Sequence, residues 1–238
     1  MINEALDIPR WRDALHREGR VQVADFLQAD AAARLRQCLA EEVPWTLALR
    51  DAAAARTIDA ATYAAMDDGD RLHLYVEAAV SAHGLQGDAA FRFAYDSYMM
   101  VPAYREGRDP GLLLHRVLEL FNSPPYIAFA RALSGDARIR RVNAQATRYR
   151  PGQFLRYHTD VDSSEGRLYA YVLNLSAHWQ ADWGGLLQFI DDGGRVTDTF
   201  LPRYNSLSLF AVPAGHAVSL VAPWAGEDRL AITGWWLS

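Results

Sequence analysis

The stretch RYHTDVD, residues 156–162, holds two side chains that can ligate a metal, His158 and Asp160, one residue apart. Side chains alternate between the faces of a β-strand, so a strand through this stretch would point both to the same side. An H-x-D pair recurs by chance in unrelated proteins, and its meaning depends on the rest of the chain. A third ligand, and a group that makes use of the metal, are therefore needed.

The composition is that of an ordinary globular protein: 238 residues, half of them hydrophobic and 22% charged. The net charge of −5 gives no electrostatic reason to expect nucleic acid or an anionic membrane as a partner. The single cysteine, Cys38, excludes an intramolecular disulfide and fits a reducing compartment. The opening MINEALDIPRWRD is not a secretory signal, and no apolar run could span a bilayer, so we expect a cytoplasmic protein.

The first part of the chain, about residues 1–137, has mainly helical patterns with a few strands. Helical spacing follows Asp30, and three later segments have the same character, namely residues 71–84, 109–122 and 123–135. Strands are predicted at 20–27, 42–51 and 91–100. Residues 52–70 show no strong apolar face, and we interpret them as a mobile connection or lid.

From about residue 138 the pattern changes to short strands separated by turn signals. DDGG at 191–194 joins two of them in a predicted hairpin. Many short strands indicate a sandwich or a partly open barrel, with the helices of the first part covering one face. We therefore predict one domain, 1–238, mostly β with a helical flank; its strands in the second part are predicted at 138–150, 167–175, 184–190, 195–200, 206–212, 216–221 and 229–237.

His216, in VPAGHAVSL, is the best candidate for the third ligand because it opens a strand directly after a glycine turn. Two imidazoles and one carboxylate form a facial triad that suits non-haem Fe(II) and leaves coordination positions open. Zinc would fit the same side chains less specifically. His178 competes for the role but lies in a predicted loop, and Asp162 shares a face with His158 only if the strand continues.

Arg229 heads the last predicted strand, where alternation places Arg229, Ala231, Thr233 and Trp235 on one face. A guanidinium that points into a cavity needs an anion, and it matches a carboxylate in bidentate geometry. A cavity with Fe(II) and an arginine is suited to a dicarboxylic keto acid. The alternative for Arg229 is a surface salt bridge with Glu227 or Asp228.

Five motifs together carry a family resemblance: YRPGQFLRYHTDVD, YVLNL, WGGLLQF, PAGHAV and DRLAITGWW. Residues 140–237 resemble the 2-oxoglutarate- and Fe(II)-dependent dioxygenases, and within them the prolyl-hydroxylase-like branch. The resemblance implies a double-stranded β-helix, or jelly roll, and makes His158, Asp160 and His216 the iron ligands. It also implies that Arg229 binds the 5-carboxylate of 2-oxoglutarate.

The resemblance assigns further contacts to the cosubstrate. It places Tyr149 as a hydrogen-bonding partner, although a tyrosine packed in the core is an equal alternative. Thr233 and Trp235 match inward positions next to the cosubstrate and the iron. A second tyrosine of some relatives aligns with Val172, with Tyr171 one place off, and this contact stays open.

The resemblance implies hydroxylation of an unactivated C–H bond with 2-oxoglutarate and O2, giving succinate and CO2. The favoured substrate is a prolyl residue in a protein or peptide, as in prolyl 4-hydroxylases, with ascorbate assisting. A free amino acid or small metabolite is the first alternative. A non-catalytic binding module and a zinc or manganese enzyme of cupin type are the others. Asp160 argues against halogenation, since halogenases of this group lack that ligand.

Overall fold

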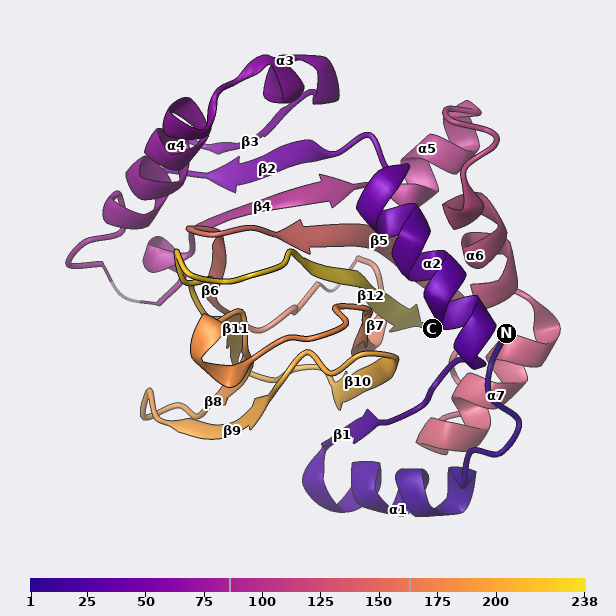
Figure 1. Ribbon diagram of the computed structural model, residues 1–238. Coiled ribbons are helices and arrows are strands. Elements are labelled where there is room, and N and C mark those ends of the chain that lie inside the picture. Colours follow the sequence, from indigo (N-terminus) through magenta and orange to yellow (C-terminus); the bar gives the residue numbers. More distant parts are fainter. Residues whose placement is uncertain (86, 163) are drawn as a thin grey trace.

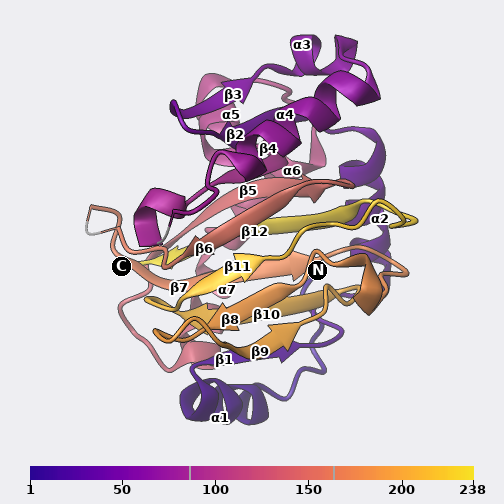
Figure 2. The same cartoon turned by 90° about the vertical axis from the view of Figure 1, so that its left-hand side faces the viewer.

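The computed structural model describes residues 1–85, 87–162 and 164–238, and its centre is a long antiparallel sheet that rolls up on itself (Figures 1 and 2). This jelly roll confirms the predicted fold class. In spatial order its strands are β1 (Arg20–Val23), β10 (Ser206–Ala211), β7 (Arg167–Asn174), β12 (Arg229–Leu237), β5 (Arg141–Tyr149), β4 (Phe93–Tyr98), β6 (Phe154–His158), β11 (His216–Val218), β8 (Leu187–Ile190) and β9 (Val196–Phe200). The hairpin predicted at DDGG joins β8 to β9.

Helices cover the outer face of the half formed by β5, β12 and β7, as expected from the sequence (Figure 1). Their apolar side chains pack against those of the strands; Leu35 and Phe121, for example, share one buried cluster with Ile232 and Trp236. Among the described residues, no helix combines the length and the apolar character needed to span a membrane. The helices of this layer are α2 (Ala29–Glu41), α5 (Met100–Glu106), α6 (Leu113–Phe121) and α7 (Pro124–Ser134), and α1 (Ile8–Glu18) packs beside α7 and β1.

The stretch 52–70, predicted as a connection or lid, contains regular structure. β3 (Ala55–Ile58) pairs with β2 (Thr46–Arg50), which lies beside β4, and α3 (Ala60–Ala65) and the start of α4 (Asp68–Val80) follow. Both helices begin after an aspartate whose side chain accepts a backbone N–H, Asp59 from Thr62 and Asp67 from Asp70. These caps were present in the sequence, and the weak apolar periodicity concealed them. A short 3₁₀ turn, η1 (Gly87–Ala90), leads from α4 to β4, and another, η2 (Ala181–Trp183), precedes β8.

Strand β12 has both faces buried, and the two faces serve different parts of the molecule. Leu230, Ile232 and Trp236 belong to the core under the helices. Arg229, Thr233 and Trp235 line a cavity inside the roll, where the second half of the sheet faces the first. The alternation predicted for this strand is therefore confirmed.

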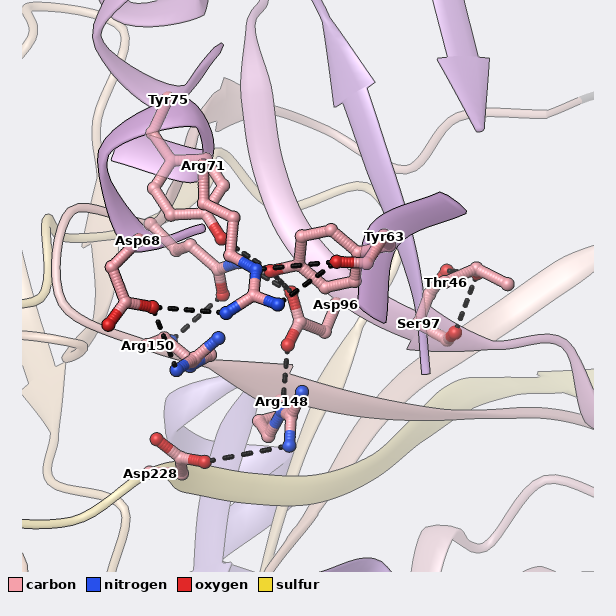
Figure 3. A network of polar contacts seen from close by, with 11 residues as sticks. Thr46, Tyr63, Asp68, Arg71, Tyr75, Asp96, Ser97, Arg148, Arg150 and Asp228 are labelled. Atoms are coloured by element: carbon pink, nitrogen blue, oxygen red, sulfur yellow. Dashed lines mark hydrogen bonds and ion pairs between the residues drawn. The ribbon is translucent and has the colours of Figure 1, made fainter. Parts of the chain in front are cut away.

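A buried polar network attaches α3 and α4 to the outer face of the sheet (Figure 3). Its centre is Asp96 on β4, which is fully buried and accepts hydrogen bonds from Tyr63 Oη at 2.7 Å and Gln153 Nε2 at 2.6 Å. Arg148 Nε on β5 donates to the same carboxylate at 2.7 Å. Tyr75 on α4 contacts Tyr63 through the two hydroxyls. The carboxylate thus has three partners, from α3, from β5 and from the loop before β6.

Replacing Asp96 by Ala should lower the free energy of unfolding by about 3–5 kcal/mol, because the Arg148 guanidinium would lose its buried partner. Urea unfolding followed by circular dichroism measures the change. Asp68→Ala is the control: its carboxylate also pairs with arginine, but its side chain is 88% exposed, so the change should be less than about 1 kcal/mol. Equal effects of the two substitutions would contradict the central place of Asp96.

Candidate metal and 2-oxoglutarate site

The structure brings His158, Asp160 and His216 together in the cavity. His158 ends β6 and His216 begins β11, and the two residues are direct partners across these antiparallel strands. Asp160 Oδ1 lies 3.3 Å from His158 Nε2, and Oδ2 lies 3.5 Å from His216 Nε2. One potential ligand atom from each residue lies within 4.8 Å of the others. His178 is not part of this group.

Asp160 reaches the histidines by a turn and not by strand alternation, so that part of the sequence argument was wrong. β6 stops at His158, and Asp160 adopts a left-handed backbone conformation with φ of 60°. Short polar side chains tolerate this conformation better than most. Arg167 Nη1 donates to the Asp160 carbonyl at 3.4 Å. Asp162, the other carboxylate considered, accepts from the Ser164 amide and hydroxyl.

Both imidazoles are oriented by backbone carbonyls. His158 Nδ1 lies 3.0 Å from the Arg156 carbonyl, and His216 Nδ1 lies 2.8 Å from the Ala214 carbonyl. A carbonyl can only accept, so each Nδ1 donates its proton there, and Nε2 is the ring nitrogen directed toward Asp160. This arrangement is the usual one for histidines that ligate a metal.

The charge states of these groups favour a cation. Burial alone would raise the pKa of Asp160, but the hydrogen bond with His158 and the neighbouring His216 outweigh it and lower this pKa to about 2. Burial, together with the nearby His158, lowers the pKa of His216 to about 4. Near neutral pH the group therefore offers an ionised carboxylate and a neutral His216 imidazole, which are the forms that bind metals.

Arg229 is the most unusual buried group of the cavity. Its side chain is 1% exposed, and it forms no ion pair with a carboxylate of the described residues. Its Nε has no hydrogen-bond partner there, and its guanidinium lies 5.0 Å from the ring centre of Tyr149. Burial lowers its pKa. The surface salt bridge considered from the sequence is absent: Glu227 pairs with Arg36, and Asp228 with Arg148.

Gly185 of WGGLLQF makes room for this arginine, and Gly184 lets the chain pass close to the Leu220 backbone. A Cβ on Gly185 would lie 3.1 Å from Arg229 Cδ and 3.0 Å from the Trp179 ring. A Cβ on Gly184 would lie 1.9 Å from the carbonyl oxygen of Leu220. Both glycines also have positive φ angles, which other residues rarely adopt. The chain can pass this close to Arg229 only where side chains are missing.

Tyr149 lies at the inner end of a row of rings along one side of the cavity. Its ring stacks on Tyr95 at 5.3 Å, Tyr95 lies 5.5 Å from Phe93, and Phe93 lies 5.5 Å from Phe91. We call these four residues the aromatic wall. Burial raises the pKa of Tyr149, so its phenol keeps a proton to donate. The alternating aromatics of FRFAYDSY signalled the strand, but not that it faces the site.

The other predicted contacts also lie on the cavity wall. Thr233 and Trp235 both line it, and the indole Nε1 of Trp235 is buried without a hydrogen-bond partner. Arg167 lies 3.8 Å above the Trp235 ring. On β7, Val172 points toward the cavity, whereas the Tyr171 hydroxyl donates to the Asn143 carbonyl on the side of the helices. Tyr171 is therefore turned away from the site.

Comparisons with known proteins show what the sequence and the fold resemble. Residues 144–237 match the sequence profile described as the 2OG-Fe(II) oxygenase superfamily. Prolyl 3-hydroxylase OGFOD1 of Xenopus laevis is 37% identical over 81 residues, which are 31% of this chain and only 16% of that protein.

Two solved structures share the fold over nearly the whole chain. The Pseudomonas putida prolyl-4-hydroxylase superposes with a TM-score of 0.58 at 21% identity, covering 97% of this chain and 98% of that one. A Trichoplax adhaerens prolyl hydroxylase, solved with a hypoxia inducible factor peptide, gives 0.58 at 17% identity, covering 97% and 88%. Residues 144–237 are therefore similar in sequence to the 2OG-Fe(II) oxygenase superfamily. In fold, the chain is similar to these two prolyl hydroxylases.

If the three clustered side chains ligate a metal, His216→Ala should weaken binding of Fe(II) or its probe Co(II) at least a hundredfold, because a donor is lost. Anaerobic titration followed by calorimetry measures the affinity. His178→Ala is the matched control, since this histidine lies in a loop outside the cluster, and its affinity should equal that of the unchanged protein. Equal binding by both variants would remove His216 from the ligand set.

Proposed function

We propose that the chain is a 2-oxoglutarate-dependent dioxygenase that hydroxylates an unactivated C–H bond of a prolyl residue in a protein or peptide. Succinate and CO2 are the coproducts. One observation carries the reaction class: a two-histidine, one-carboxylate cluster and a buried, unpaired arginine share one cavity of about 650 Å³. Cavities of about 300–1,000 Å³ are typical of ligand sites, so both cosubstrate and substrate can be accommodated.

The donor set fits the metal of the superfamily. His158, Asp160 and His216 supply two nitrogens and one carboxylate, the set typical of non-haem Fe(II) oxygenases, with the remaining positions open. The Nδ1–H groups of the two histidines donate to the Arg156 and Ala214 carbonyls, which hold the rings in position before a metal binds. When bound, Fe(II) together with 2-oxoglutarate activates O2 for oxidation of a C–H bond.

Arg229 fits the far carboxylate of 2-oxoglutarate. A buried guanidinium without an anion is costly, and a carboxylate ligand would satisfy its free N–H groups in a charge-assisted hydrogen bond. The protonated Tyr149 phenol, beside this guanidinium, would donate to the same carboxylate. Thr233 and Trp235, on the same face of β12, would line the cosubstrate along the way to the histidines.

The aromatic wall and Val172 give the cavity apolar surface beside its polar side chains. Exclusion of water protects a reactive oxidising centre from side reactions and strengthens the electrostatic contacts inside the site. The apolar surface would also accept the ring of a prolyl residue. Support for a prolyl substrate comes from the relatives named as prolyl hydroxylases, one a 3-hydroxylase and one a 4-hydroxylase. The proposal therefore specifies the prolyl ring and leaves its carbon open.

Two accompanying conditions belong to the same proposal. Ascorbate is included as a reductant that maintains the iron as Fe(II), following the family resemblance. The reaction is placed in the cytoplasm, where a reducing environment suits both the iron and the buried, free Cys38. A zinc or manganese enzyme of cupin type, or a binding module without activity, would have no need for the unpaired Arg229.

The reaction itself can be tested with protein loaded anaerobically with Fe(II) and then given O2, 2-oxoglutarate and proline-containing peptides or a cell lysate. We expect succinate in amounts that match a mass gain of one oxygen on a prolyl residue. Mass spectrometry measures both. Oxidation of a free amino acid in place of a peptide would move the assignment to the small-molecule alternative, and absence of succinate would reject the dioxygenase.

Arg229→Ala should raise the KM for 2-oxoglutarate about 30-fold or more, since a buried charge contact of this kind is worth roughly 2–5 kcal/mol. The control changes the ligand and not the protein: 2-oxobutyrate has the keto acid group but lacks the far carboxylate. The unchanged protein should prefer 2-oxoglutarate strongly, and the variant should lose this preference. If the preference survives in Arg229→Ala, another group binds the carboxylate.

A further inference from the structure

A second guanidinium lies at the outer end of the aromatic wall. Arg50 is the last residue of β2 and pairs with Phe93 across the β2–β4 ladder, so both side chains stand on the face that lines the cavity. The Arg50 guanidinium carbon lies 5.7 Å from the centre of the Phe91 ring. The four rings therefore run from one arginine, Arg229, to another, Arg50.

Arg50 has no anionic partner among the side chains that the structure describes. Its neighbour in sequence, Asp51, pairs with Arg56 at 3.0 Å. Arg167 is the third arginine of the cavity lining. It is already neutralised by Glu165 at 2.8 Å and by Asp162 at 3.7 Å. Among the described residues that line the cavity, Arg50 and Arg229 are thus the two arginines without an anionic partner.

Arg50 lies close to the histidines, where a substrate would react, and at the opposite end of the aromatic wall from Arg229, where the cosubstrate carboxylate would bind. The Phe91 ring centre lies 5.2 Å from that of His158, so Arg50 is separated from the metal cluster by one aromatic ring. Arg229 lies at the other end of the wall, beside Tyr149. An extended peptide advances about 3.3–3.6 Å per residue, so a group on Arg50 would lie within about three residues of an atom at the cluster.

We propose that Arg50 binds a carboxylate of the substrate that is oxidised, so that this substrate is an acidic peptide or, under the small-molecule alternative, a free amino acid. The inference rests on the proposed function and adds the substrate's charge to it. A single guanidinium with an aromatic ring on one side suits one planar carboxylate. A dianionic phosphate would need a second free cation, and Arg167 is occupied.

The test measures binding by calorimetry, without O2, to protein loaded with Mn(II) and 2-oxoglutarate. Two matched pairs of probes separate the sources of the carboxylate. The first pair is an eight-residue peptide with a central proline and Glu two residues to either side, and its twin with Gln. The second pair is L-proline and L-prolinamide. Each pair differs only in whether a carboxylate or a neutral amide is offered.

We expect the protein to bind the carboxylate member of one pair about tenfold more tightly, the usual worth of a charge-assisted hydrogen bond. Arg50→Gln should abolish this preference, and Arg50→Lys should keep part of it. Arg56→Gln is the matched control, because Arg56 lies on the adjacent strand β3 and is paired with Asp51; it should leave the preference intact. A preference for the peptide pair indicates a protein substrate, and one for the proline pair a free amino acid.

The proposal is overturned if neither pair shows a preference, if no probe binds, or if Arg50→Gln discriminates as the unchanged protein does. Circular dichroism of Arg50→Gln and Arg50→Lys shows whether they fold. Succinate formation by the unchanged protein separates this result from the proposed function. Succinate without any preference for carboxylates rejects the role of Arg50 alone, whereas absence of succinate rejects the dioxygenase.

Discussion

The Arg229 guanidinium, buried without a carboxylate partner among the described residues, is the constraint on which the cavity inside the rolled sheet depends. Removing an ion from water costs several kcal/mol unless a partner is supplied, and Arg229 is 1% exposed. The adjacent Tyr149 ring compensates only in part, since cation–π contacts are worth about 0.5–2 kcal/mol. A ligand that brings the missing anion would bind only the folded chain and would stabilise it. Folding and ligand binding are thus coupled at this residue.

The group formed by His158, Asp160 and His216, the candidate metal site, depends on a different feature: it lies where β6 ends and β11 begins. His158 and His216 face each other across β6 and β11, and the register of these strands shifts directly after His216. Asp160 completes the group from a left-handed turn, with its carbonyl held by Arg167. Two of the three candidate ligands are therefore positioned by sheet pairing and one by a loop, so changes in the loop can alter this group while the sheet stays intact.

Local patterns were sufficient for much of the fold. The helix over residues 123–135 and the alternation of β12 could be read directly from the sequence, and the structure has both as predicted. Helix α3 and the first residues of α4 were missed, because their signal lay in the aspartate caps and not in apolar periodicity. Asp160 was chosen for a reason that the structure does not bear out.

The parts of the site that could not be predicted are those assembled across distant strands. Nothing near Arg50 in the sequence indicates Phe91 or His158, because the three meet only through the β2–β4 and β4–β6 ladders. Likewise the aromatic wall joins residues of β4 to Tyr149 on β5. Motifs report on residues that share a turn or a strand, whereas contacts between strands depend on register, which a single sequence specifies only indirectly.

The end of β5 and the start of β12 contribute residues both to the polar network on the outer face of the sheet and to the candidate site on its inner face. On β5, Arg148 points outward to Asp96, and its neighbour Tyr149 points inward. Asp228 likewise pairs with Arg148 on the outside, directly before Arg229 on the inside. A slip of one residue would exchange these faces, burying the wrong charges on both. The outer ion pairs therefore oppose such a slip, and in doing so they keep Tyr149 and Arg229 directed into the cavity.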